Sequence, residues 1–308
     1  MARKRKGQPV HGWLVLDKPK GLSSAQAVGR VRYLLEAQKA GHGGTLDPLA
    51  SGVLPIALGE ATKTMSFVMD GAKAYRCWLR FGEARTTDDG EGAVTATSRV
   101  RPTAAEIEAV LGEFEGDVEQ IPPVYSAIKI DGQRAYKLAR ANQVVDMKPR
   151  TVRIDRVRLV EMPEPDLAVI DVECQKGTYI RALGRDLAIR LGSVAYLADL
   201  RRIQVGPFHE SDAISLDSLE SLGHSARLEE AVLAVMTVLD DIPALALSQV
   251  EAGNMRHGMS VPVDCVLART PDVTVDEGDT VVATDGALPV ALARIEGGFI
   301  RPVRVLNL

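Results

Sequence analysis

The segment that most constrains what this chain can become is Gly41–Leu54, which reads GHGGTLDPLASGVL. Its four glycines and Pro48 suit a tight turn in which the backbone comes close to a ligand. Such a turn would present His42 and Asp47 as reactive side chains, and we take Asp47 as the candidate nucleophile. The alternative is an ordinary polar turn, because an Asp before a Pro commonly begins one.

Length and composition predict a soluble, globular protein. The 308 residues are 46% hydrophobic and 25% charged, which is enough for one large domain and a small one. No run of about eighteen apolar residues indicates a membrane span, and glycine rather than an apolar signal-peptide core follows the basic run Arg3–Lys6. We therefore expect a cytoplasmic protein without a membrane partner.

The residues that bind metals and cofactors form no motif. The three cysteines, Cys77, Cys174 and Cys265, make no CxxC or CxxH pair, which argues against a disulfide framework or a zinc site. The five histidines are scattered, and we find no Walker loop and no Rossmann fingerprint. We expect no metal and no cofactor.

Charge is distributed unevenly along the chain, although the net charge is only −4. Residues 1–40 hold nine Lys or Arg against two acids, and residues 125–160 hold nine against three. Residues 211–250 hold one against seven. This asymmetry predicts a basic face that grips phosphates, whereas the run Arg3–Lys6 taken alone could be only a solvated tail.

Periodicity predicts a mixture of strands and helices. Two capping boxes, Ser23 with Gln26 and Thr103 with Glu106, open helices, and a third helix ends at Gly192. Strands are expected from alternation and turn signals at Trp13–Leu16, Tyr75–Phe81, Ala127–Ile130 and Leu167–Cys174.

Strands clustered around few helices predict an α+β domain with a mixed or antiparallel sheet. We assign a flexible basic tail to residues 1–12, this domain to residues 13–242 and a small β-rich domain to residues 243–308. In the last part, short runs such as Asp279–Ala283 and Leu288–Ile295 alternate with glycine turns.

Four sequence blocks resemble, in order and spacing, the motifs of the bacterial tRNA pseudouridine-55 synthases, the TruB family. Gly41–Leu54 resembles the catalytic loop of that family nearly residue for residue. The other blocks are LDKPKGLSS at Leu16–Ser24, PPVYSAIKIDGQRAYKLAR at Pro122–Arg140 and KGTYIRAL at Lys176–Leu183. The resemblance implies the pseudouridine synthase fold, a C-terminal PUA-like domain, and an isomerase that converts the T-loop uridine of tRNA to pseudouridine.

The resemblance also implies roles for residues. Asp47 would attack the sugar or the base, and one carboxylate suffices because the intermediate must not be hydrolysed. Arg181 would pair with Asp47 and keep it charged. Tyr75 would stack on the flipped base and remove a proton late in the reaction, and Tyr179 and Leu200 would line the base pocket.

Several other residues have weaker assignments. His42 would fill the gap that the flipped base leaves. Lys18 and Pro19 would buttress the catalytic loop, and Lys63 stands in a position suited to phosphate. Tyr125, Ser126 and Lys129 would support the floor of the pocket.

Each assignment has a structural alternative. His42 could be hydrogen-bonded within its turn, Tyr75 and Tyr179 could be half-buried core tyrosines, and Leu200 could be a core residue. Arg181 could face solvent at the start of a helix.

Two other functions compete with a stand-alone tRNA-modifying enzyme. One is a tRNA-binding or tRNA-folding protein without catalysis. The other is a guide-dependent synthase of the dyskerin type, which needs protein partners and a guide RNA. This chain lacks the long basic extensions of that class, so we expect tRNA, through its T arm, as the partner and no obligatory protein partner.

Overall fold

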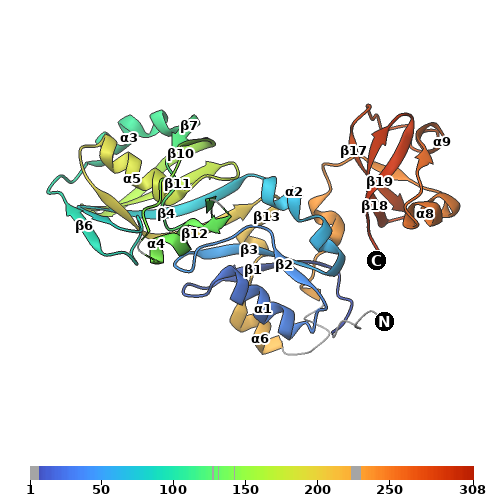
Figure 1. The fold of residues 1–308 in the computed structure, drawn as a ribbon, viewed down its shortest axis with the longest axis horizontal. Coiled ribbons are helices and arrows are strands. Elements are labelled where there is room, and N and C mark those ends of the chain that lie inside the picture. Colours follow the sequence, from blue (N-terminus) through green and yellow to red (C-terminus); the bar gives the residue numbers. More distant parts are fainter. Residues whose placement is uncertain (1–6, 127, 131, 142, 223–229) are drawn as a thin grey trace.

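The computed structural model describes residues 7–126, 128–130, 132–141, 143–222 and 230–308. Figure 1 shows a large body built on a long twisted sheet and a smaller β body beside it, joined near α2 (Met65–Asp70). The α+β class with a mixed sheet and a C-terminal β domain is confirmed.

The large body is organised by a ten-stranded sheet, in which eight strands follow the order β14-β1-β3-β12-β4-β11-β10-β7. Most neighbours are antiparallel, while β1 with β14 and β3 with β12 are parallel pairs. β2 pairs with β3, and β13 pairs with β12. The strands are β1 (Gly12–Lys18), β2 (Ala40–His42), β3 (Ser51–Leu58), β4 (Lys73–Phe81), β7 (Gly116–Gln120), β10 (Arg150–Glu164), β11 (Leu167–Cys174), β12 (Ala195–Val205), β13 (Phe208–His209) and β14 (Ile214–Ser215).

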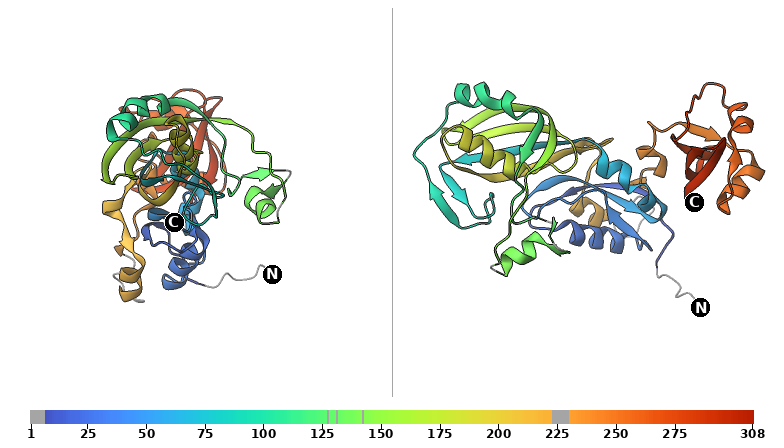
Figure 2. Two further views of the ribbon diagram at one scale, coloured as in Figure 1. Left: turned by 90° about the vertical axis from the view of Figure 1, so that its left-hand side faces the viewer. Right: turned by 45° about the horizontal axis from the view of Figure 1, so that its top comes forward.

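Helices cover one face of this sheet and share one core cluster with it. They are α1 (Ser24–Leu34), α3 (Ala104–Leu111), α5 (Ile180–Arg190) and α6 (Leu216–Leu222). Two short hairpins, β5 (Glu83–Arg85) with β6 (Val94–Thr97) and β8 (Lys129–Ile130) with β9 (Gln133–Arg134), lie off the sheet. Helix α4 (Ala135–Arg140) follows the second hairpin and stands out from the body in both views of Figure 2.

The central strands are buried on both faces. In β1, Leu14 and Leu16 belong to the helix-covered core, whereas Trp13 and Val15 belong to a second cluster on the opposite face. Successive side chains of a strand point to opposite faces, so a strand with two covered faces reads as a continuous apolar run. This explains the run Trp13–Leu16, whose predicted strand is confirmed.

Local sequence signals correspond to the observed elements. Both capping boxes form, at the starts of α1 and α3. The predicted strand Leu167–Cys174 is β11, and Tyr75–Phe81 lies in β4 with Cys77, Leu79 and Phe81 buried. Of the expected strand Ala127–Ile130, Lys129–Ile130 forms β8, while Ala127 and Asp131 lie outside the described residues.

Only the middle of the glycine-rich segment Gly41–Leu54 is a loop, because both of its ends lie in strands. His42 ends β2 and Ser51 begins β3, so residues 43–50 form the connection between two antiparallel strands. Gly52 remains necessary, because its φ is +101° and a Cβ there would lie 2.2 Å from the Arg202 carbonyl oxygen. The glycines therefore permit close approach of strands as well as a turn.

Residues 7–12, which we expected in a flexible tail, are hydrogen-bonded to the large body. The Gln8 amide donates to the Glu36 carbonyl at 2.6 Å, and the Gln38 amide donates to the Gln8 carbonyl at 3.1 Å. The Glu60 amide donates to Nδ1 of His11 at 3.1 Å. For these residues the prediction is wrong, because their partners lie far along the chain and leave no local signal; residues 1–6 lie outside the described residues.

The smaller body contains a five-stranded sheet in the order β15-β17-β18-β19-β16. Its own core includes Leu245, Val281, Val290 and Ile300. The strands are β15 (Ala244–Ala246), β16 (Val261–Pro262), β17 (Thr280–Asp285), β18 (Leu288–Glu296) and β19 (Phe299–Val305), and the helices are α8 (Gln249–Arg256) and α9 (Val263–Leu267).

The C-terminal residues return to the large body after β19. Leu306 is 1% exposed and belongs to the cluster that contains Trp13 and Val15. Lys63 Nζ donates to the Val305 carbonyl at 2.7 Å and pairs with Glu60 at 2.6 Å. Lys63 thus contacts the junction between the two bodies, and the phosphate contact expected for it stays a prediction.

This junction generates a stability prediction. Leu306→Ala should lower the free energy of unfolding by about 2–4 kcal/mol, because it removes a buried side chain and leaves a cavity. Thermal unfolding should show a melting temperature several degrees below wild type. Val303→Ala is the matched control, since Val303 lies three residues before Leu306, in β19, and is 54% exposed. Equal losses in the two variants would contradict the buried role of Leu306.

Candidate active site

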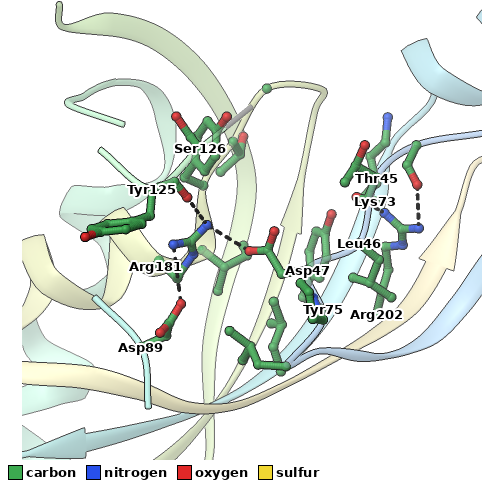
Figure 3. Close-up of a pocket in the computed structure, with 18 of the residues that line it drawn as sticks. Thr45, Leu46, Asp47, Lys73, Tyr75, Asp89, Tyr125, Ser126, Arg181 and Arg202 are labelled. Atoms are coloured by element: carbon green, nitrogen blue, oxygen red, sulfur yellow. Dashed lines mark hydrogen bonds and ion pairs between the residues drawn. The ribbon is translucent and has the colours of Figure 1, made fainter. Parts of the chain in front are cut away.

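A cavity of about 690 Å³ opens over the middle of the large sheet. Its wall comes from the β2–β3 loop, β4, the start of α5, β12 and the segment around α4. Four of the sequence-predicted site residues point into this region together with Asp47, and they are Tyr75, Tyr179, Arg181 and Leu200. Figure 3 shows Asp47 between Arg181 on one side and Tyr75 with Arg202 on the other.

The loop that carries Asp47 is held by helix α1. Ser24, which is 3% exposed, accepts a hydrogen bond from the Leu46 amide at 2.8 Å and donates to the Leu46 carbonyl at 2.9 Å. The Pro48 carbonyl accepts from the Gly21 amide at 2.7 Å. Asp47 is therefore flanked by two fixed residues while its own side chain remains 38% exposed in the cavity.

Arg181 is the ion-pair partner of Asp47. Its Nη2 lies 2.9 Å from Oδ2 of Asp47, and its Nη1 lies 3.3 Å from Oδ2 of Asp89. The guanidinium also donates to the carbonyls of Thr87 and Tyr125, each at 3.0 Å. Since Arg181 is 6% exposed, these four contacts fix its orientation and aim it at Asp47.

Tyr75 projects from β4 beside the nucleophile loop. Burial raises the pKa of its hydroxyl above the ordinary value, and the charge of Arg202 and its hydrogen bond to Tyr75 oppose that shift. The ring can stack on a planar base and the hydroxyl is a titratable group, so both roles expected of Tyr75 are chemically open to it.

Tyr179 and Leu200 also line the cavity. Tyr179 caps the start of α5, where its amide donates to Oε1 of Gln120 at 3.1 Å. The Arg150 guanidinium lies 4.8 Å from the centre of the Tyr179 ring. Leu200, on β12, is 6% exposed and shows that a cavity-lining position can also be a core position.

Of the six residues assigned to catalysis or base binding, His42 alone does not line the cavity. It ends β2, opposite Ile56 of β3, and its Nδ1 is buried without a hydrogen-bond partner in the described part of the chain. Burial chiefly, with the nearby Arg202 charge, lowers the pKa of His42, and a hydrogen bond with the Gly44 backbone opposes this shift. This lowered pKa favours the neutral ring near pH 7.

Positive charge gathers around the cavity. Seven of the residues that line it are Lys or Arg and four are Asp or Glu. The cations are Lys73, Arg134, Arg140, Arg150, Lys176, Arg181 and Arg202. Beneath the loop, Lys18 is fully buried and donates to the Pro19 and Leu22 carbonyls, each at 2.8 Å; burial lowers its pKa to about 8, against the opposing effect of Asp47.

Two residues of the site were not predicted from sequence. Asp89 is 2% exposed and shares Arg181 with Asp47, and Arg202 is 1% exposed. Asp89 lies in TTDDGEG, a stretch that reads as a polar turn, and Arg202 follows Leu200 in a strand. The only available signal was a charged residue in an otherwise apolar or turn context, which is common on protein surfaces.

The arrangement combines a carboxylate on a rigid loop, a guanidinium that keeps it ionised, an aromatic wall and a basic rim. In such a site the carboxylate can attack a flipped-out nucleotide covalently, and the basic rim can bind its phosphates. Among the described residues, no cluster of three or more His, Cys, Asp or Glu could hold a metal ion. In the same described part, no helix has the length and apolar character needed to cross a membrane.

Sequence comparison places this site in a known group of enzymes. Residues 32–180 match the family model described as TruB family pseudouridylate synthase, N-terminal domain. Residues 181–242 match that of the tRNA pseudouridylate synthase B C-terminal domain. A protein of Rhodospirillum rubrum called tRNA pseudouridine synthase B is 50% identical over 100% of both chains. One of the same name from Caulobacter vibrioides is also 50% identical over 100% of both.

The chain therefore belongs to the TruB family of pseudouridylate synthases. Enzymes of this family isomerise uridine in RNA, as the sequence resemblance implied.

Two solved structures share the fold. A Cbf5–Nop10–Gar1 complex matches with a TM-score of 0.71 and 24% identity, covering 100% of this chain and 90% of the other. An H/ACA RNP bound to a substrate RNA containing 2′-deoxyuridine matches with a TM-score of 0.73 and 22% identity, covering 100% and 92%. At these identities the likeness establishes the pseudouridine synthase fold and nothing further.

The shared guanidinium generates a prediction about coupling. Arg181→Met should destabilise the fold by about 3–5 kcal/mol, because Asp89 would keep a buried carboxylate without its cation. The double variant Arg181→Met with Asp89→Asn should regain most of that stability yet remain inactive, since Asp47 still lacks its partner. Unfolding by denaturant and pseudouridine formation are the two measurements. Additive destabilisation in the double variant would show that the two side chains are not coupled.

Proposed function

We propose that this protein converts the T-loop uridine at position 55 of tRNA to pseudouridine, acting alone. The observation that carries the proposal is the ion pair between Asp47 and Arg181 at 2.9 Å inside a basic cavity. The names of the curated relatives, at 50% identity over the full chain, support tRNA as the substrate. The T arm is the element that carries this uridine, and the basic rim suits its phosphates.

In this mechanism Asp47 is the nucleophile. Its carboxylate attacks the flipped uridine at the sugar or the base, and the N-glycosidic bond breaks. The uracil turns and rejoins the sugar through carbon, the bond to Asp47 breaks to release the carboxylate, and the uracil nitrogen that left the sugar gains a proton in place of the one lost from that carbon. Before the attack, Arg181 keeps Asp47 charged and oriented. Tyr75 stacks on the base and takes the proton that the new carbon–carbon bond displaces. Tyr179 and Leu200 form the walls that hold the turning ring.

His42 has a different place in the proposal. A flipped base leaves a gap in the T-loop stack, and His42 is proposed to contact the RNA there. Because the side chain lies outside the cavity in this structure, that contact requires the RNA to approach β2 and the loop from the rim. The alternative, a histidine that only supports its turn, is favoured by the place of His42 at the end of β2, among residues that do not line the cavity.

Two domains are proposed to share the tRNA. Residues 13–242 form the catalytic domain and residues 243–308 a PUA-like domain, a division supported by the separate sheet that begins at Ala244. The match to the C-terminal family model ends at residue 242. The second domain has eight acids against five Arg, so its RNA contacts should be weaker than those of the cavity rim. Neither a cofactor nor a protein partner is required, and the cytoplasm stays the predicted location.

The nucleophile is tested by Asp47→Asn. Pseudouridine formation should be abolished while tRNA affinity stays within a few-fold of wild type, because the side chain keeps its shape and the rim is unchanged. The assay is tritium release from 5-labelled uridine in a tRNA transcript with purified protein alone, together with filter binding. Asp166→Asn is the matched control, since Asp166 forms a 2.9 Å ion pair with Arg80 away from the cavity.

Each result of that assay has a defined meaning. Turnover by Asp47→Asn near the wild-type rate would rule out the nucleophile. Failure of wild-type protein to act without a guide RNA or protein partners would favour the dyskerin-type alternative. Tight tRNA binding without any release of tritium by wild type would favour a binding or folding protein.

Tyr75 is tested separately by Tyr75→Phe, which keeps the stacking face and removes the hydroxyl. The variant should bind tRNA normally and form pseudouridine at least about a hundredfold more slowly, because a positioned acid or base contributes roughly that much. Single-turnover product analysis measures the effect. Normal turnover would mean that the tyrosine is only a stacking wall and that another base takes the proton.

A further inference from the structure

Arg202 is a buried cation that the mechanism above does not use. It lies on β12, is 1% exposed, and forms no ion pair with any described carboxylate. Burying a guanidinium without a counter-ion is costly unless its N–H groups are well satisfied. Asp47, although close, is paired with Arg181 instead. A buried arginine in this position therefore needs a structural or catalytic explanation.

The guanidinium of Arg202 is hydrogen-bonded to the backbone on both sides of Asp47. Its Nε donates to the Val53 carbonyl at 2.8 Å, Nη1 to the Thr45 carbonyl at 3.1 Å and Nη2 to the Gly44 carbonyl at 3.2 Å. Gly44 and Thr45 precede Asp47, and Val53 follows it. One planar group thus ties together both ends of the loop, a task for which the fork of arginine is suited and the single ammonium of lysine is not.

The backbone around Arg202 is matched to the loop as well. β12 and β3 are parallel neighbours with Arg202 opposite Gly52, and a Cβ on Gly52 would lie 2.2 Å from the Arg202 carbonyl oxygen. The glycine lets the two strands approach closely, which brings the guanidinium within reach of the loop carbonyls. The contact between Arg202 and the catalytic loop therefore depends on Gly52 as well as on the arginine.

Arg202 also faces Tyr75. In the antiparallel pair β12–β4, Arg202 is directly opposite Tyr75, and directly opposed residues place their side chains on the same face in contact. The guanidinium is close enough to the tyrosine side chain to oppose the rise in the pKa of its hydroxyl. Figure 3 shows the two groups adjacent, on the side of Asp47 away from Arg181.

The electrostatic surroundings of Tyr75 come from three other elements. Arg202 on β12 lowers the pKa of the hydroxyl, whereas Asp47 on the loop and Cys174 on β11 raise it, and burial raises it most. Arg202 is thus the only one of these groups that favours the anionic form of the tyrosine. A tyrosine that accepts a proton needs that form.

We propose that Arg202 is the positioning residue that joins the Asp47 loop and Tyr75 into one rigid frame, and that its charge supports Tyr75 when the tyrosine accepts a proton. The inference rests on the proposed function for its catalytic consequence. It requires two separable properties of Arg202, which are its three hydrogen bonds to backbone carbonyls and its positive charge.

Two substitutions separate those properties. Arg202→Lys keeps the charge but cannot bond the three carbonyls, so kcat should fall about tenfold to a hundredfold through misplacement of Asp47, with tRNA affinity within a few-fold. The pH at which its rate changes on the alkaline side of the pH–rate profile should be the same as in wild type. Arg202→Met loses both properties, so kcat should fall further and the profile should move to higher pH by about one unit. The matched control is Arg201→Met, because Arg201 pairs with Asp17 and Glu210 outside the cavity.

Two measurements need no substrate. Hydrogen exchange of the amides at positions 43–53 should accelerate in both Arg202 variants and not in the Arg201 variant, while amides of the C-terminal domain stay unchanged. The pKa of Tyr75, followed by NMR of ring-labelled tyrosine and assigned with Tyr75→Phe, should rise in Arg202→Met and stay near wild type in Arg202→Lys. Should Arg202→Met fail to fold, Arg202→Lys alone decides the positioning role.

Wild-type kcat in Arg202→Lys, or unchanged loop exchange, would overturn the positioning role. A Tyr75 pKa in Arg202→Met equal to that of wild type would overturn the role of the charge. These outcomes are distinct from failure of the proposed function, which would appear as wild-type protein that makes no pseudouridine in tRNA while the loop and tyrosine measurements still give their answer.

Discussion

The structure depends on holding one carboxylate-bearing loop rigidly against a sheet, and two buried guanidinium groups do this from opposite sides. Arg181 binds the Asp47 carboxylate directly and is itself fixed by Asp89 and two backbone carbonyls. Arg202 binds the backbone on both sides of Asp47. A loop rich in glycine is conformationally free in the unfolded chain, so several strong contacts are needed to select one conformation.

The buried cations of the site are compensated mainly by backbone carbonyls, as for Lys18 and Arg202. Lys18, Lys73, Arg181 and Arg202 are each at most 8% exposed, and only Arg181 among them is ion-paired within the described residues. Desolvation of these cations costs free energy in the empty enzyme. The overall net charge of −4 does not reveal these buried cations, because the acids lie mainly in other segments.

The second domain is attached through packing rather than through charge. Leu239, Val282 and Leu292 form a small cluster with Phe67 of α2, and Leu306 enters a core cluster of the large body. Lys63 and Glu60 bond to the backbone of the last residues at 2.7 and 2.8 Å. A β domain held in this manner has a defined position relative to the cavity.

The sequence by itself determined the local elements and the identity of the chemistry. Capping boxes, apolar alternation and the loop around Asp47 depend on neighbours within a few residues, and the family motifs named Tyr75, Arg181 and Leu200. Tertiary structure alone decided which distant groups meet: Asp89 beside Arg181, Arg202 opposite Tyr75, and His42 outside the cavity. Those contacts follow from the register of β12 with β3 and β4 and from the path of the chain after β4. Strand register is set by the packing of whole faces, so no short segment of sequence encodes it.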